Sequence, residues 1–203
     1  MTIQTRTTEL EAVNTVLSTI GEAPLSTLSG ALPVDGTMAK NVLNEINREV
    51  QSMGWHFNTH HKASLSKETN NKIPIATNVL RVELNPYKYS KTDYDIVQRN
   101  NYLYNLATNS DSFTKDFTEA TLIYLLDFAD IPEQAKRYIT VRSARVFHDR
   151  TLGANTLHKF SLEDEQKSLA VLRQAEMQTG DFTVFDSPEQ VYTVGRNKTH
   201  WWY

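Results

Sequence analysis

The sequence predicts an α+β protein, a four-helix bundle with an inserted small antiparallel β domain and an extended C-terminal tail. Apolar residues recur at steps of three and four before residue 57 and again after residue 131, which is the period of helices with one buried face. Between these regions lie short extended runs separated by turn residues. We therefore expect the bundle in residues 1–60 and 128–180, the β domain in residues 61–127, and the tail in residues 181–203.

The first two helices have clear boundaries in the sequence. Thr8 and Glu11 have the Thr-x-x-Glu spacing of a capping box, which predicts a helix start. Residues 25–36 are rich in Ser, Gly and Pro and predict a loop. The helix within residues 35–57 has the cleanest apolar stripe and should end at Gly54, and we expect the rest of the chain to pack around it. The stripe consists of Ala39, Val42, Leu43, Ile46, Val50 and Met53.

The pattern of residues 61–127 predicts strands. Arg99-Asn100-Asn101 should form a tight hairpin turn between two of them, because Asn tolerates the positive φ that such turns need. Pro74 stands at a strand entry, where its missing N–H does least harm. The expected strands are residues 63–66, 75–84, 95–98, 102–104 and 118–126.

The third helix should begin at Pro132, with Asp130 or a neighbour as its cap, and run to about Leu152, with Gly153 as the stop. Arg142 falls in the middle of its apolar face. A charge in that position must be paired or lie at a subunit boundary.

The fourth helix is expected over about residues 155–179, with Gly180 as its end. We expect Arg142 to pair, within the bundle or across a subunit boundary, with either Glu165 or Glu176 of this helix. Its apolar side is thin, and consists of Leu162, Leu169, Leu172 and Met177.

Composition excludes several classes of function. The chain has 21 basic and 24 acidic residues, and a net charge of −3 argues against a nucleic-acid-binding protein. It has no cysteine, so disulfides, thiolate chemistry and cysteine zinc sites are excluded. No signal peptide and no apolar run of about 18 residues is present, so we expect no membrane anchor. We also expect no cofactor.

Two groups of residues could carry chemistry. The first group comprises His56, His60 and His61. His56 and His60 have the i, i+4 spacing of a zinc-binding pair on a helix, but the surrounding sequence favours exposed or interface histidines over a metal site. The second could supply the acid and base of a tail-associated glycan hydrolase, which we keep as the alternative function; it comprises Glu83, Asp93 and Asp95. No complete catalytic set is visible, so we expect a structural protein rather than an enzyme.

An ordered series of short motifs resembles the podovirus tail tubular protein A family, the head-to-tail adaptors of short-tailed bacteriophages. The resemblance covers roughly the first 58 residues and residues 131–154 well, and the segment between them only in pattern. The motifs are AVN at 12–14, IGEAP at 20–24, STL at 26–28, AKNVLN at 39–44, INR at 46–48, GWHFN at 54–58, IPE at 131–133, SAR at 143–145 and LGA at 152–154.

The resemblance implies a structural virion protein of the tail, assembled in the cytoplasm of the bacterial host. It implies a homo-oligomeric ring, twelve-fold, between the portal protein and the tail nozzle protein, tail tubular protein B. Phage DNA would pass through the lumen of the ring without sequence-specific binding.

Three sets of residues are then candidates for contacts. On the third helix, Arg142, Arg145 and Arg150 are expected at a subunit interface or the lumen, or else on a solvated face. In the β domain, Tyr102 and Tyr104 are expected to face the nozzle. The aromatic tail is expected to dock on the portal, although it could instead fold back on its own bundle or on a sister protomer; its contact residues are Arg196, Lys198, Trp201, Trp202 and Tyr203.

Overall fold

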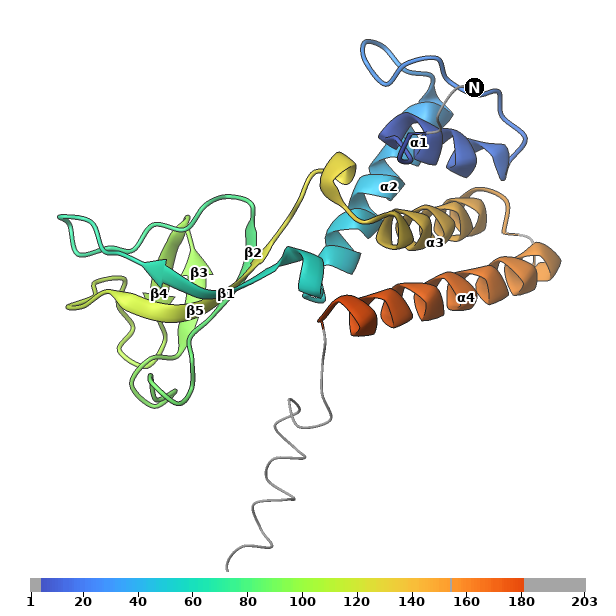
Figure 1. Ribbon diagram of the computed structural model, residues 1–203. Coiled ribbons are helices and arrows are strands. Elements are labelled where there is room, and N and C mark those ends of the chain that lie inside the picture. The colour runs from blue at the N-terminus through green and yellow to red at the C-terminus, as the bar shows by residue number, and fades with distance from the viewer. Residues whose placement is uncertain (1–4, 154, 181–203) are drawn as a thin grey trace, which may run out of the picture.

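The computed structural model describes residues 5–153 and 155–180, and the side chains of all of these except residues 155–161 and 180. It has four helices and small antiparallel sheets, so the predicted α+β class is confirmed. Figure 1 shows the helices gathered at one end of the molecule and the strands projecting at the other. The elements in order are α1 (Glu9–Ser18), α2 (Val34–Ser52), η1 (His56–Asn58), β1 (Thr59–Leu65), β2 (Val79–Glu83), β3 (Ile96–Arg99), β4 (Tyr102–Asn105), β5 (Phe117–Tyr124), η2 (Phe128–Asp130), α3 (Glu133–Thr151) and α4 (Asn155–Gly180).

Helix α1 begins as predicted. The Glu11 N–H donates to Thr8 Oγ1 at 3.2 Å, and the Thr8 N–H donates to the Glu11 carboxylate at 2.7 Å, so both halves of the capping box form. The hydrogen bonds that the Thr8 backbone and the Thr8 hydroxyl donate to the carboxylate lower the pKa of Glu11, and the backbone bond has the larger effect.

Helix α2 begins earlier than predicted, at Val34 instead of after the loop at residue 36. Pro33 is the N-cap, and its carbonyl accepts from the Thr37 N–H at 2.9 Å. Gly36, which indicated a loop in the sequence, lies inside the helix, where a Cβ would come within 2.9 Å of the Leu25 side chain. The glycine therefore serves close packing and not chain reversal.

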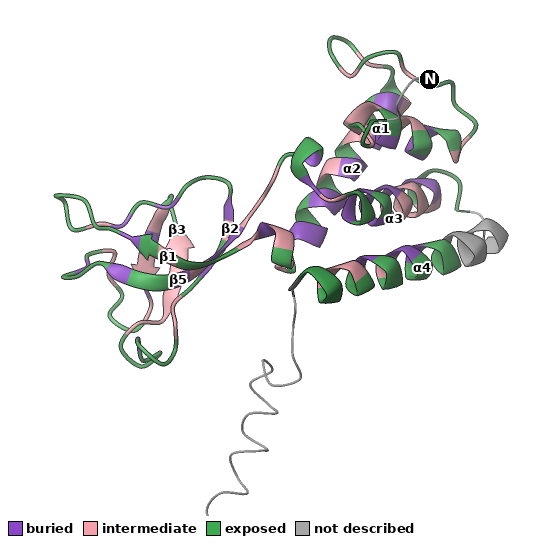
Figure 2. Cartoon of the chain, viewed as in Figure 1, coloured by how far each residue is buried: buried purple, intermediate pink, exposed green. Residues whose placement is uncertain are grey.

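The helical core is centred on α3, not on α2 as we expected. Helix α3 packs against α1, α2 and α4, whereas α2 packs against α1 and α3. Five of the six predicted stripe residues of α2 are buried, but Met53 is exposed because the helix has already ended at Ser52. Figure 2 shows the buried side of α2 and α3 turned toward the other helices. The buried apolar residues of this core are Ala12, Val13, Val16, Leu17, Ala39, Val42, Leu43, Ile46, Val50, Phe128, Ile131, Ala135, Tyr138, Ile139, Phe147 and Leu172.

The caps and stripes of α3 and α4 differ from the prediction in two places. Pro132 is the N-cap of α3 and no side chain caps it, because Asp130 belongs to the short η2 turn. On α4, Leu172 is buried, but Leu162 and Met177 are exposed. Helix α4 lies against α3 and η1 on one side only, so the ends of its apolar stripe have no helix to cover them. No helix among the described residues is long and apolar enough to cross a bilayer.

The strands form a three-stranded antiparallel sheet in the order β1-β5-β2 and a two-stranded sheet, β3-β4. The β3-β4 hairpin is confirmed, with Asn100 at φ 51° and Asn101 at φ 62° in its two-residue turn. The strand predicted over residues 75–84 is shorter, because a turn precedes it in which the Val79 N–H donates to the Ala76 carbonyl. Strand β1 conversely begins at Thr59, earlier than predicted. A second cluster of buried apolar residues lies among the strands and is separate from the helical core.

Two buried amides join the helical part to the strands. Gln51 of α2 donates to the Leu126 carbonyl at 3.0 Å and accepts from the Leu126 N–H at 2.8 Å, as a neighbouring strand would. Asn58 donates to the carbonyls of Gln51 and Tyr124, both at 2.8 Å. Both side chains are fully buried. They hold together the two points at which the chain leaves and re-enters the helical part.

Candidate functional site

A largely buried ion pair joins helices α3 and α4. Arg145 Nε donates to the Glu165 carboxylate, and Arg145 Nη1 donates to Asp149 Oδ2 at 3.1 Å. The Arg145 and Glu165 side chains keep only 18% and 11% of their surface exposed. The hydrogen bond to Glu165 raises the pKa of Arg145, so the guanidinium stays charged.

Arg142 extends this pair to a third helix. Its Nη2 donates to Glu49 Oε1 of α2 at 2.5 Å, its Nη1 donates to the Tyr138 hydroxyl at 2.9 Å, and its Nε lies 3.8 Å from Glu165 Oε1. The predicted pairing of Arg142 with Glu165 is confirmed, but Glu49 is the closer partner. We call these residues the interhelical ion-pair cluster: Glu49, Arg142, Arg145, Asp149 and Glu165.

Arg150 lies outside this cluster. It forms a two-pronged pair with Glu45 of α2, at 2.7 and 2.8 Å, and both side chains are about half exposed. All three candidate arginines of α3 therefore have carboxylate partners within the chain. Their expected place at a subunit interface or lumen stays a prediction.

Of the two alternative partners expected for Arg142, Glu165 is the one that the structure places beside it, and Glu176 lies elsewhere. Glu176 instead accepts a hydrogen bond of 2.5 Å from the backbone N–H of His56, where the end of α4 meets η1. Burial raises the pKa of Glu176, and this effect outweighs the His56 hydrogen bond, which lowers it.

The histidines do not converge on one point. The His60 ring lies 4.6 Å from the Tyr124 ring, and His61 Nδ1 is 3.4 Å from Thr121 Oγ1. Within the part of the chain that the structure describes, no three His, Asp or Glu side chains are grouped as a metal site requires.

Tyr102 and Tyr104 are half-buried on β4, on either side of the fully buried Leu103. Lys72 Nζ lies 5.7 Å from the Tyr102 ring centre, and the Arg99 guanidinium lies 4.1 Å from that of Tyr104. Because alternate residues of a strand share a face, both tyrosines lie on the side away from Leu103. Their expected contact with a nozzle stays a prediction.

The three candidate carboxylates of a hydrolase are only partly brought together. Glu83 and Asp95 line one pocket of about 350 Å³, and Asp93 lines another. Glu83 is already paired with Arg81 at 3.0 Å. A glycan hydrolase therefore stays the alternative hypothesis, with its three candidate carboxylates divided between two pockets.

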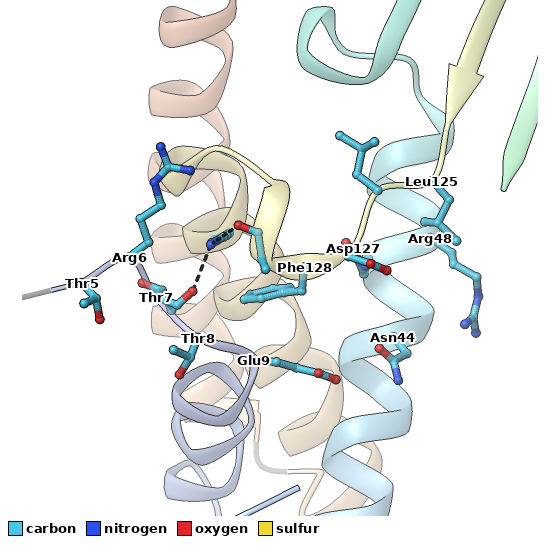
Figure 3. A pocket seen from close by; sticks show the side chains of 14 residues that line it. Thr5, Arg6, Thr7, Thr8, Glu9, Asn44, Arg48, Leu125, Asp127 and Phe128 are labelled. Atoms are coloured by element: carbon cyan, nitrogen blue, oxygen red, sulfur yellow. Dashed lines mark hydrogen bonds between the residues drawn. The ribbon is translucent and has the colours of Figure 1, made fainter. Parts of the chain in front are cut away.

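A larger pocket, which the sequence did not indicate, lies beside the N-terminal arm (Figure 3). Its volume is about 740 Å³, and it lies between the arm, Thr5–Thr8, and the segment Leu125–Ala129. Lys136 of α3 lines it with only 1% of its surface exposed. Its Nζ donates to the carbonyls of Thr7 at 3.1 Å and Ala129 at 3.0 Å. A lysine in a helical pattern usually indicates a solvated face, so no local signal could have predicted its burial.

The residues expected to bind a portal lie outside the described part of the chain. They are Arg196, Lys198, Trp201, Trp202 and Tyr203.

Comparison with known protein families finds a match. A family model described as tail tubular protein matches residues 10–182, which include α1 from its second residue, the helices α2 to α4 and both sheets. The comparison with curated proteins finds no match.

Proposed function

Because the chain belongs to the tail tubular protein family, whose members are structural components of phage tails, we propose that it is the head-to-tail adaptor of a short-tailed phage. In this role it joins the portal protein to the tail nozzle protein and forms part of the channel for DNA. The family match over residues 10–182 carries the proposal. The ordered series of motifs at residues 12–58 and 131–154 supports the adaptor over other tail proteins.

The adaptor acts as a homo-oligomeric ring, which we propose is twelve-fold and assembles in the host cytoplasm. The exposed apolar side chains include two separate pairs, Val34 and Met38 at the start of α2 and Val171 and Met177 on α4. A ring needs two different surfaces on each protomer, one for each neighbour. Helix α4 also packs on one side only, which supports a protomer that completes its burial in an assembly.

The partners of the ring follow from the same role. We propose that the tail residues 196–203 dock on the portal, that the β part with Tyr102 and Tyr104 faces the nozzle, and that DNA passes through the lumen without sequence-specific contacts. The α3 arginines would contribute to the subunit boundary chiefly through Arg150, because Arg150 and Glu45 are the most exposed of the pairs.

The adaptor role is tested by mixing the purified protein with portal particles and imaging them by electron microscopy. We expect a ring on one face of the particle. The matched variant lacks residues 196–203, and should bind portal at least tenfold more weakly, about 1.4 kcal/mol. Its melting transition should stay nearly unchanged. Wild-type protein that forms no ring on the portal would contradict the adaptor role, and a truncated chain that melts early but binds normally would assign the tail to the fold.

A further inference from the structure

Lys136 is a buried cation with no ion-pair partner among the residues that the structure describes. Lysine is almost never fully buried without a counter-ion, because removing an ammonium group from water costs several kcal/mol. Its partners in the structure are the Thr7 and Ala129 carbonyls and the Phe128 ring, whose centre lies 5.6 Å from Nζ. None of these carries a charge, and none of the ion pairs of the described residues includes Lys136.

The pocket beside Lys136 has a lining that suits one negative charge. Three cationic and two anionic side chains line it, namely Arg6, Arg48 and Lys136 against Glu9 and Asp127. Figure 3 shows Arg6 and Arg48 at opposite ends of the pocket, with the Phe128 ring between them. An excess of one positive charge fits a carboxylate better than a phosphate group, which carries up to two charges.

The walls of the pocket suit a peptide. The N-terminal arm and residues 125–127, which belong to no helix or strand, line it, and Leu125, Leu126 and Phe128 offer apolar surface to the methylene groups of a side chain. Its volume of about 740 Å³ is within the range of ligand sites and much larger than one water molecule requires.

We propose that this pocket binds an acidic side chain presented by a protein partner, with Lys136 as the counter-ion. The inference goes beyond the proposed adaptor role and does not depend on it, because the binding can be measured with an isolated peptide.

The test is calorimetric titration of the full-length chain with two blocked tripeptides, acetyl-Gly-Glu-Gly-amide and acetyl-Gly-Gln-Gly-amide. These differ only in charge. We expect the Glu peptide to bind at least tenfold more tightly. In Lys136→Met the preference should fall below twofold, while in Lys40→Gln, which removes a cation of α2 outside the pocket, it should be unchanged.

A second variant keeps the test decisive if Lys136→Met does not fold. Arg48→Gln changes an exposed side chain at the edge of the pocket and should reduce the preference about threefold. Equal binding of both peptides to the wild-type chain would overturn the proposal, as would an Arg48→Gln chain that keeps the full preference.

Two further results would replace the proposal by another. Inorganic phosphate that binds more tightly than the Glu peptide would indicate a site for phosphate groups. The second result compares the full chain with a chain that lacks residues 1–4. If only the shortened chain prefers the Glu peptide, the protein's own N-terminus occupies the pocket.

Discussion

At Gln51 a single side chain takes the place of a neighbouring strand. Its side-chain amide pairs with both backbone groups of Leu126. Its backbone carbonyl accepts a hydrogen bond from the Asn58 side chain. A buried backbone group that loses its partner costs about 1–3 kcal/mol. Gln51 therefore contributes to stability through the backbone hydrogen bonds that it completes, more than through the area that it buries.

The first prediction removes this pairing while keeping the volume of the side chain. Gln51→Met leaves the Leu126 N–H and carbonyl without their partner, so we expect a loss of about 2–3 kcal/mol in the free energy of unfolding, measured by urea denaturation. The control is Gln174→Met on the exposed face of α4, which should change it by less than about 0.5 kcal/mol. Equal midpoints of urea denaturation for Gln51→Met and wild type would show that the pairing of Gln51 with Leu126 contributes nothing to stability.

The second prediction concerns pH and Glu176. Because burial raises the pKa of Glu176, the folded state binds its proton more tightly than the unfolded state does. The protein is then destabilised by this group as the pH rises from its ordinary pKa of 4.5 through the raised folded value, and the penalty is complete above that value. Glu176→Gln keeps an oxygen that accepts from His56 and has no such penalty.

We therefore expect Glu176→Gln to match wild type in stability at about pH 4 and to be more stable at pH 7. Thermal unfolding across this range measures the difference. Glu163→Gln, on the exposed side of the same helix, is the control and should show no such trend. A Glu176→Gln chain that is less stable at pH 7 than wild type would mean that the charged hydrogen bond to His56 outweighs burial.

At the scale of elements, α4 contributes little to the buried apolar core. Leu172 is its one member of the buried helical core among the described residues, and Glu165 receives the arginines of α3. We expect such a pair to matter for the attachment of this helix. Removing one partner would leave the other charge buried and unpaired, which is costly.

The third prediction measures this attachment by a double-mutant cycle. Arg145→Met and Glu165→Gln should each lower the free energy of unfolding, and the coupling energy between them should be about 2 kcal/mol. The control cycle uses Asp164 and Lys167 of the same helix, a pair at 3.8 Å whose side chains are 65% and 73% exposed. Its coupling should be below about 0.5 kcal/mol. Equal coupling in the two cycles would show that burial does not strengthen the Arg145–Glu165 pair.

At the scale of the whole molecule, the two separate buried clusters lead us to propose two folding units. The chain enters and leaves the sheet at one place, because Thr59 and Ile123 are opposite each other in the pairing of β1 with β5. Leu126 and Phe128 belong with the helices.

The fourth prediction is that residues 61–122 can be replaced by a short Gly/Ser linker without unfolding the helices. The linker has little distance to span, and the pairing of Gln51 with Leu126 is kept. Circular dichroism should retain the helical signal, with a cooperative thermal transition. Loss of helicity would show that the helical part needs the sheet to fold.

The sequence by itself determined the features that depend on near neighbours. The Thr8–Glu11 capping box, the Asn100–Asn101 hairpin turn and the stop at Gly153 each involve residues within a few positions, so their geometry follows from local stereochemistry. The apolar stripe of α2 was also readable, because helical period alone places its residues on one face.

Tertiary structure alone decided which polar residues are inside. Gln51, Asn58 and Lys136 are polar residues of the kind that usually faces solvent, and each is buried with at least one partner from a segment 66 to 129 positions away. Glu49, not Glu165, became the closest partner of Arg142 because α3 packs between α2 and α4. Such pairings depend on how distant elements meet in space, and neither period nor propensity carries that information, because both report only the chain's own neighbourhood.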